Sequence, residues 1–288
     1  MMRRVRAPRS AGMALVVVLW IVAAMSVLVT GLILTTRAQV GTVAAGRDAA
    51  VGQALGDAAI AITLQALLVT TPMPNGVQTV PVTYADQTLQ VEVAPLNGLI
   101  SLNGAGAPLL AAMLQGGGGL PPAVAEDMAQ QMVIWRSEVP QLQTPGIVSG
   151  PRMFEAPEDL LLFPGIGYDL YARLAPLVTA DLRTNRVNAQ AAPPEVLAAL
   201  APGDAGRIAQ FIAARGGDQP ADSSFFDTNL ISSGSSAGRF YRVRVKVPLD
   251  AGKILVLTRD VALVNAPSNL LPWRLLRQSR QVQSSGAS

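Results

Sequence analysis

The stretch Met13–Leu34, MALVVVLWIVAAMSVLVTGLIL, contains no charged residue, and the rest of the chain is arranged around it. At a helical rise of about 1.5 Å per residue it spans roughly 33 Å, enough to cross a bilayer core of about 30 Å. Residues 1–12 hold four arginines and no acid. Because basic residues beside a first membrane helix resist translocation, we predict one membrane helix with a cytoplasmic N-terminus and the bulk of the chain on the far side.

Three interpretations of this segment are open. A cleaved secretory signal needs a short apolar core and a small-x-small cleavage site, but residues 10–36 are uncharged and no clear site follows at the proper distance. A plain signal anchor needs only the apolar length. The third interpretation rests on Ser10–Ala14, SAGMA, where a glycine separates the basic leader from the apolar helix. This boundary resembles the prepilin-peptidase site of type IV pilins and pseudopilins, and the cut would fall between Gly12 and Met13.

The membrane helix departs from the general pilin pattern at one position. Most members of that family carry Glu at the fifth residue of the mature chain, and counting from Met13 that residue is Val17. A carboxylate in the bilayer is costly unless it is paired. Its absence is similar to one branch, the K-type minor pseudopilin of type II secretion (general secretion pathway protein K). On this interpretation Leu15, Val17 and Trp20 lie in the membrane helix.

Composition limits the possible functions. The chain has no Cys and no His, which removes thiol nucleophiles, the commonest zinc ligands and the usual general base. We predict that it is not an enzyme, although a Ser-Lys or carboxylate mechanism stays formally open. The net charge of +3 falls to −1 without residues 1–12, and residues 41–260 carry −5. A body of this sign is a poor ligand for nucleic-acid phosphates.

Residues 37–71 are predicted to continue the membrane helix as an amphipathic half. Val51, Leu55, Ile62 and Ala66 recur at helical spacing, as in a helix with one buried face. Its glycines lower its intrinsic stability, so this half must be held by packing against a soluble domain. The run of residues 70–74, TTPMP, ends the helix because a residue before proline is driven out of the helical region.

Two pairs of strands are predicted, one on each side of a long helical region. Residues 77–84 and 88–93 flank one turn, and residues 239–247 and 254–264 flank another. Apolar and polar residues alternate in these runs, which indicates half-buried strands. Since the sheet opens before the helical region and closes after it, that region is predicted to be inserted into the sheet domain. The residues after 265 are predicted to be a polar, disordered tail with Trp273 exposed.

The helical region between the strand pairs is predicted to be entirely α-helical. Gly116–Gly119 are predicted to form a flexible loop, and Asp159 is predicted to cap the start of a helix. Helices are expected near residues 107–115, 122–138, 158–162, 169–178, 194–200 and 204–215.

Two runs in this region resemble helix-hairpin-helix motifs, namely residues 162–167, LFPGIG, and 187–197, VNAQAAPPEVL. In DNA-binding examples the glycine turn offers backbone N–H groups to a phosphate. Asp169 follows the first turn and Asp204 lies in the second, and we predict that both carboxylates cap helices and repel phosphate. The favoured interpretation is a pair of packing hairpins. The alternative function is a membrane-anchored helix-hairpin-helix DNA-binding protein of an uptake system.

An acidic loop raises the question of a metal. Asp218, Asp222 and Asp227 lie close in sequence, but their spacing does not match a calcium-binding EF-hand. A solvated loop is favoured and no metal ligand is assigned. Some K-type pseudopilins bind calcium in their helical domain, so the resemblance keeps calcium as an alternative.

The resemblance to K-type pseudopilins covers about residues 9 to 265 and implies an α+β fold. In it, a pilin-like long N-terminal helix packs on a small antiparallel sheet, and a large all-α domain of SAM- or helix-hairpin-helix-like hairpins is inserted into the sheet. The implied segments are residues 1–12 (leader), 13–36 (membrane helix), 37–71 (periplasmic half), 72–98 and 238–265 (strands), 99–237 (inserted domain) and 266–288 (tail).

The resemblance also implies a role and partners. The chain is expected to be cleaved by prepilin peptidase, to reside in the inner membrane with its bulk in the periplasm, and to cap the pseudopilus tip. Its expected partners are the other minor pseudopilins at the tip, the major pseudopilin, prepilin peptidase and inner-membrane lipid, without nucleic acid.

Overall fold

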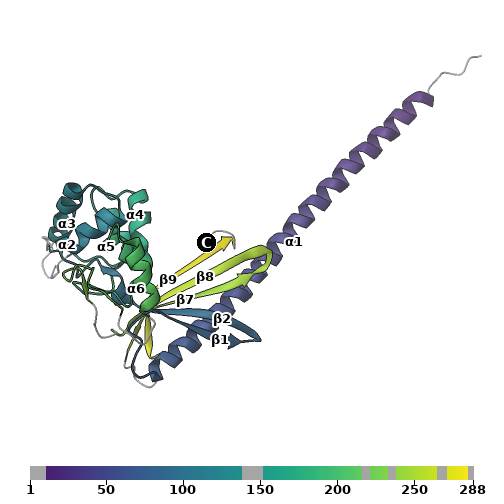
Figure 1. Ribbon diagram of the computed structural model, residues 1–288. Coiled ribbons are helices and arrows are strands. Elements are labelled where there is room, and N and C mark those ends of the chain that lie inside the picture. The colour runs from purple at the N-terminus through teal and green to yellow at the C-terminus, as the bar shows by residue number, and fades with distance from the viewer. Residues whose placement is uncertain (1–10, 138–151, 216–220, 233–237, 265–270, 285–288) are drawn as a thin grey trace, which may run out of the picture.

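The computed structural model describes residues 11–137, 152–215, 221–232, 238–264 and 271–284, with residues 11–14, 27–45 and 251 described by backbone alone. The molecule is α+β (Figure 1). It consists of a long N-terminal helix, an antiparallel sheet against the C-terminal half of that helix, and a group of shorter helices beside the sheet. In Figure 1 the N-terminal half of the long helix projects away from the body, and the shorter helices lie at the opposite end.

The long helix α1 is continuous from Ala11 to Val69, 59 residues in all. At about 1.5 Å per residue it is roughly 90 Å long. It joins the predicted membrane stretch and the predicted amphipathic half without a break, and it ends two residues before the predicted end. Its C-terminal half packs on the sheet through Ala59, Ile60, Leu64 and Leu67, all of which are buried.

Within the described residues the sheet has five strands in the order β1-β2-β7-β8-β9, and every neighbouring pair is antiparallel. The four predicted strands are confirmed with shifts of one to two residues at their ends. The hairpin between β1 and β2 turns at Ala85 and Asp86, which both have positive φ, the backbone of a type I′ turn. The strand bounds are β1 Gln78–Tyr84, β2 Gln87–Pro95, β7 Phe240–Leu249, β8 Lys253–Leu263 and β9 Trp273–Ser284.

The prediction of a disordered tail is wrong for residues 273–284. These residues form β9, which pairs with β8 from Lys253↔Ser284 to Leu263↔Trp273. Trp273 is partly buried and packs against the core under the sheet, so the prediction that it is exposed is also wrong. The sequence of these residues is mostly polar because β9 is an edge strand and most of its side chains on both faces are exposed to solvent. Residues 266–270 and 285–288 of the predicted tail lie outside the described residues.

The chain leaves the sheet after β2 and returns to it at β7, which pairs directly with β2. The predicted helices of the intervening region are present, with Pro194–Leu200 reproduced as predicted. The elements are η1 Leu96–Gly98, β3 Ile100–Ser101, α2 Ala107–Ala112, the π-helical turn η2 Met113–Gly117, α3 Pro122–Ser137, η3 Pro157–Leu162, α4 Tyr168–Leu174, η4 Ala175–Leu177, β4 Val178–Thr179, β5 Val187–Asn188, α5 Pro194–Leu200, α6 Ala205–Ala214 and β6 Ile231–Ser232.

The region is not entirely helical, contrary to the prediction. Two short parallel ladders, β3 with β4 and β5 with β6, connect its segments. Each strand has only two residues, which is too short to produce a visible alternation in the sequence. Three buried polar residues lie on these ladders, namely Ser101, Thr179 and Asn188, and the side chain of each makes a hydrogen bond.

The prediction of a flexible loop is wrong for two of the four glycines, Gly116 and Gly117. Gly116 and Gly117 end the π-helical turn η2, and a Cβ on Gly116 would lie 2.0 Å from the carbonyl oxygen of Ala199 on α5. A Cβ on Gly117 would lie 2.3 Å from Leu177. Gly116 and Gly117 therefore have no room for a side chain, because α5 and Leu177 approach this turn too closely.

Two hydrophobic cores hold the body together. One lies between α1 and the sheet and includes Val91, Val243, Val245 and Leu257. The other lies within residues 96–231 and is the larger of the two. Phe240 of β7 and Leu276 of β9 pack against this second core, so the sheet and the helical region form one continuous body.

Candidate functional site

The N-terminal arm of α1 is apolar and uncovered. Leu15, Val17 and Trp20 are 76%, 55% and 73% exposed, and the other residues of the described stretch 15–26 are exposed as well. The predicted processing residues Gly12 and Met13 lie in the first turn of α1, and their side chains are outside the described residues. An exposed apolar surface of this kind is typical of a site that contacts lipid or another protein.

One helix of the described chain is long and apolar enough to cross a membrane, and it is α1. The stretch that meets this criterion is Gly46–Val69, with 39% of its window buried inside the molecule, while Leu15–Ser26 forms a shorter apolar stretch. Because Gly46–Val69 covers the sheet, its apolar character is explained by the core. The predicted membrane segment 13–36 is described for side chains only over residues 15–26.

The C-terminal half of α1 has two different faces. The face toward the sheet fits closely, because a Cβ on Gly56 would lie 2.6 Å from Leu257 and a Cβ on Gly52 would lie 2.6 Å from Leu249. Asp57 at the margin of this face pairs with Arg259 of β8 at 2.9 Å. Glycine at these two positions lets the helix backbone approach the sheet.

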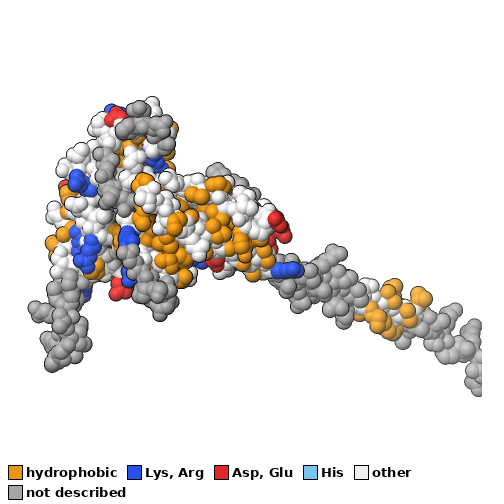
Figure 2. All heavy atoms as spheres, turned by 90° about the horizontal axis from the view of Figure 1, so that it is seen from below, with side chains coloured by type: hydrophobic (Ala, Val, Ile, Leu, Met, Phe, Trp, Pro, Cys, Tyr) orange, Lys and Arg blue, Asp and Glu red, His pale blue; other side chains and the backbone are white. Residues whose placement is uncertain are grey.

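The face of α1 that points away from the sheet carries no charge between residues 50 and 69. Figure 2 shows hydrophobic side chains gathered on the body next to the projecting helix. The exposed residues of this stretch are Ala50, Val51, Ala54, Ile62, Gln65, Ala66 and Val69. We call this set the outer face of α1. This face is uncharged and includes several alanines, as do the faces of helices that pack closely on other helices.

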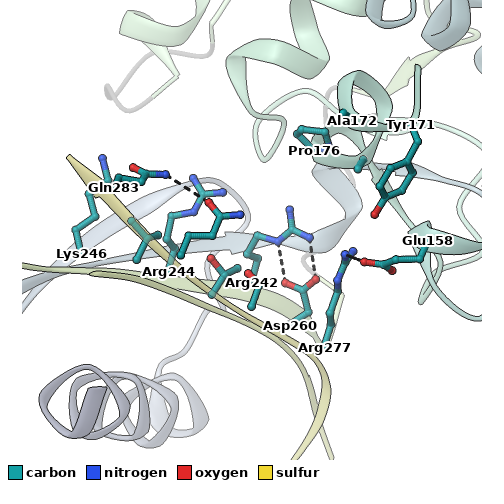
Figure 3. Close-up of a pocket in the computed structure, with 15 residues that line it drawn as sticks. Glu158, Tyr171, Ala172, Pro176, Arg242, Arg244, Lys246, Asp260, Arg277 and Gln283 are labelled. Carbon is teal, nitrogen blue, oxygen red and sulfur yellow. Dashed lines mark hydrogen bonds and ion pairs between the residues drawn. The ribbon is translucent and has the colours of Figure 1, made fainter. Parts of the chain in front are cut away.

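A polar groove of about 640 Å³ lies on the other face of the sheet, between β7, β8 and β9 and the segment η3–α4–η4 (Figure 3). Arg242 of β7 lies at its centre and donates two hydrogen bonds of 2.8 Å, from Nε and Nη2, to the carboxylate of Asp260. Burial lowers the pKa of Arg242, but its hydrogen bonds to Asp260 and the charge of that carboxylate outweigh this effect and raise the pKa overall.

The rim of the groove connects the sheet to the helical region. Arg277 of β9 pairs with Glu158 of η3, and Tyr171 of α4 lies beside them (Figure 3). Burial and the nearby Glu158 carboxylate raise the pKa of Tyr171. Burial and the charge of Asp260 raise the pKa of the Asp181 carboxyl in the same neighbourhood. The ion pair between Arg277 and Glu158 therefore joins the two walls of the groove, and the sequence patterns did not indicate that these residues meet.

The two helix-hairpin-helix-like turns have the same backbone feature. Gly165 and Gly203 each have positive φ, at 90° and 95°, just before α4 and α6. The predicted capping by Asp169 and Asp204 is wrong, because neither side chain makes a capping hydrogen bond to its helix. Asp204 instead pairs with Arg207 at 3.8 Å. Both carboxylates still lie at helix N-termini, where negative charge is favourable without a hydrogen bond.

The predicted cap at Asp159 is confirmed. Its carboxylate accepts hydrogen bonds from the backbone N–H groups of Glu155 and Ala156, at 2.7 and 3.2 Å. The element that it caps is the 3₁₀ helix η3. Asp159 is therefore bound to the backbone just before η3 and does not point into the groove that Glu158 lines.

The acidic loop is described in part. Asp222 accepts a hydrogen bond from the N–H of Ser224 and Asp227 one from the N–H of Asn229, so both form local turns. Hydrogen bonds from Ser224 lower the pKa of Asp222. Asp218 lies outside the described residues. Within the described residues no group of three or more acidic side chains is placed to hold a metal ion, and the calcium alternative stays without ligands.

Comparison with known proteins adds no family: no family model matches the chain, and no curated protein matches it.

Proposed function

We propose that this chain is a K-type minor pseudopilin of type II secretion that is anchored in the inner membrane with its bulk in the periplasm. The observation that carries the proposal is the division of α1. Residues 15–26 are exposed and almost all apolar, whereas Ala59, Ile60, Leu64 and Leu67 are buried against the sheet. A helix with one half free and one half fixed to a globular body is what a subunit needs if it is stored in lipid and later transferred into a helical filament core.

The outer face of α1 supports packing against other subunits. It is uncharged and lies on the part of α1 that packs on the body. Helices that bundle through such faces gain van der Waals contact without leaving a buried charge unpaired. The major pseudopilin and the other minor pseudopilins are the partners that this face would contact.

The proposed place in the filament is the tip. The region between β2 and β7 lies at the end of the body away from the projecting helix (Figure 1), where it would collide with a subunit stacked above. This region and the strands around it correspond to a pilin-like domain with a large helical insertion. Val17, in place of the usual Glu, means that no buried carboxylate is available for the terminal amine of a subunit ahead.

The first test is N-terminal sequencing of the full chain after co-expression with a prepilin peptidase. The expected mature chain starts at Met13, and a Gly12→Val variant is expected to keep its leader. An intact leader in both proteins, or a cut beyond residue 36, would contradict the proposal and return the chain to an anchored or secreted protein of another class.

A second test uses the absence of native cysteine. Single-cysteine variants Val51→Cys and Ile62→Cys place a thiol on the outer face of α1, and Ser279→Cys places one in the groove as a matched control. Disulfide cross-links to cysteines in other pseudopilin helices are expected from the first two variants and not from the third. Cross-links that come equally from all three variants would contradict helix packing through this face.

A further inference from the structure

The outer edge of β9 is a long strand edge without a partner among the described residues. β9 has twelve residues, pairs with β8 on one side, and ends the strand order of the sheet. The opposite edge strand, β1, is shorter and contains Pro81, which cannot donate a backbone hydrogen bond. Proteins protect exposed edges with short strands, prolines, charged side chains, β-bulges or covering segments. Of these devices β9 has three arginines and one bulge, opposite Asp260 and Val261. β9 has no proline in its twelve residues, and within the described part of the chain no strand pairs with its outer edge, so its backbone groups can accept another strand.

Beyond Trp273, Leu276 and Arg277, the side chains of β9 are also exposed. The main contacts of α1 are with β7, β1 and β8, so the helix leaves β9 beyond its margin. Leu275 and Val282, on the side of the sheet that α1 occupies, are 49% and 51% exposed. An added strand would bury these two side chains if it carried apolar residues at alternate positions.

The charge of β9 limits what can bind there. The strand contains Arg274, Arg277 and Arg280 and no acidic residue. Arg277 is paired with Glu158, and Arg280 donates to the neutral amide oxygen of Gln53. Within the described residues, no carboxylate forms an ion pair with Arg274 or Arg280. Two of the three charges at the edge are therefore not neutralised.

A second copy of β9 is a poor partner for this edge. Two paired copies would bring six arginines together without one carboxylate from either strand, and like charges across paired strands are destabilising. An extended segment that carries Glu or Asp would instead form cross-strand ion pairs with Arg274 and Arg280. The charge of the strand thus favours an acidic partner over self-association.

We propose that the outer edge of β9 binds an extended acidic segment of another protein by strand addition, with main-chain hydrogen bonds to the edge and alternate apolar residues against Leu275 and Val282. This inference rests on the sheet alone and holds whether or not the chain is a pseudopilin.

The test uses the full chain in non-ionic detergent micelles and a fluorescent twelve-residue peptide, with binding followed by fluorescence anisotropy. The peptide alternates Val and Glu, except that one central Val is replaced by Glu to face Arg280, which lies on the same side of the sheet as Leu275 and Val282. Two further peptides carry backbone N-methyl groups on one set of alternate residues or on the other. Strand addition uses the N–H groups of one edge only, so one N-methyl series is expected to lose binding and the other to keep it. Equal binding of both series, or no binding of the parent peptide, would overturn the proposal.

The role of the charges is tested with a double variant, Arg274→Glu with Arg280→Glu. Exposed ion pairs each contribute modestly, so reversal of both charges is expected to weaken binding about tenfold. Arg186→Glu with Arg207→Glu, outside the sheet, makes the same change in net charge and is expected to leave binding unchanged. Equal losses in the two double variants would mean non-specific attraction and would overturn the proposal.

Self-association is measured on the same samples. Sedimentation of the wild-type chain and of the Arg274→Glu, Arg280→Glu variant is expected to show no dimer that depends on the β9 arginines. A wild-type dimer that the charge reversal dissociates would make a second copy the occupant and would overturn the acidic-partner proposal. The N-methyl comparison uses the wild-type chain, so it decides the question of strand addition even if the double variant folds poorly.

Discussion

Two ion pairs on the same face of the sheet are expected to differ greatly in their contribution to stability. Arg242 and Asp260 form a bidentate pair at 2.8 Å, with side chains 14% and 3% exposed. Arg244, two residues along β7, pairs with Glu92 at 3.5 Å, with side chains 40% and 41% exposed. The perturbation is Asp260→Ala, and Glu92→Ala is its matched control.

The magnitude follows from burial. Asp260→Ala leaves the guanidinium of Arg242 buried without its partner, which costs about 3–5 kcal/mol. Glu92→Ala leaves Arg244 in contact with water, and an exposed pair of this kind contributes about 0–1 kcal/mol. The double replacement Arg242→Met with Asp260→Leu removes both charges and fills their space, so its stability is expected to lie close to that of the wild type.

The assay is urea unfolding of the full chain in detergent micelles, followed by tryptophan fluorescence and by proteolysis. A difference of at least about 2 kcal/mol between Asp260→Ala and Glu92→Ala is expected from the two ranges above. The double replacement is expected to recover most of the loss from Asp260→Ala. Equal costs for the two single variants, or a double variant no more stable than Asp260→Ala, would refute the argument from desolvation.

Three other predictions follow from close packing and from titration. In α1, Gly46→Ala meets open space and is expected to stabilise the protein by about 1 kcal/mol. Gly56→Ala must displace Leu257, so its free energy of unfolding, measured in urea, is expected to be about 1–3 kcal/mol lower than that of Gly46→Ala. Equal effects of the two substitutions would contradict the tight fit at Gly56. Burial raises the pKa of Asp181 above its ordinary value of 3.8, so the unfolded chain loses this proton at a lower pH than the folded chain. The free energy of unfolding therefore falls as the pH rises from 3.8 to the pKa of the folded protein, and Asp181→Asn is expected to become more stable relative to the wild type over this range. A stability difference that does not change with pH would contradict this prediction. The Tyr241 hydroxyl donates to the carbonyl oxygen of Pro74 at 3.2 Å, and burial raises the pKa of Tyr241 from 10.0 to about 12. Tyr241→Phe is expected to lower the free energy of unfolding by about 1–2 kcal/mol at pH 7. The wild type is expected to lose stability between pH 10 and pH 12 because Tyr241 ionises more easily in the unfolded chain, and the variant is not; parallel pH curves would contradict this.

Local pattern predicted most of the elements. Periodicity located α1, four of the five sheet strands and the helices of residues 107–215, because a half-buried helix or strand must alternate apolar and polar residues at its own period. The Pro-containing run after residue 70 marked the end of α1 to within two residues. The sequence alone also indicated that the sheet opens before the helical region and closes after it, and the pairing of β2 with β7 agrees with this.

Three features were not predicted correctly from the sequence, each for a different physical reason. β9 was missed because an edge strand with both faces in solvent needs no apolar alternation, and its backbone pairing with β8 leaves no mark on the side chains. Gly116 was misread because glycine serves both flexible loops and close contacts, and only the approach of α5 distinguishes them. The caps at Asp169 and Asp204 were wrong because acidic residues near a helix start act through charge as well as through hydrogen bonds.

The sequence by itself determined the apolar arm, the extent of α1, the alternating strands and the absence of Cys and His, since composition and periodicity are properties of residues near one another in the chain. Only the tertiary structure decided the Arg242–Asp260 pair, the ion pair between Arg277 and Glu158, and the open edge of β9. Each of these depends on residues far apart in sequence that meet when the sheet closes. Burial of a charge and exposure of an edge are properties of that assembled sheet and not of any one segment.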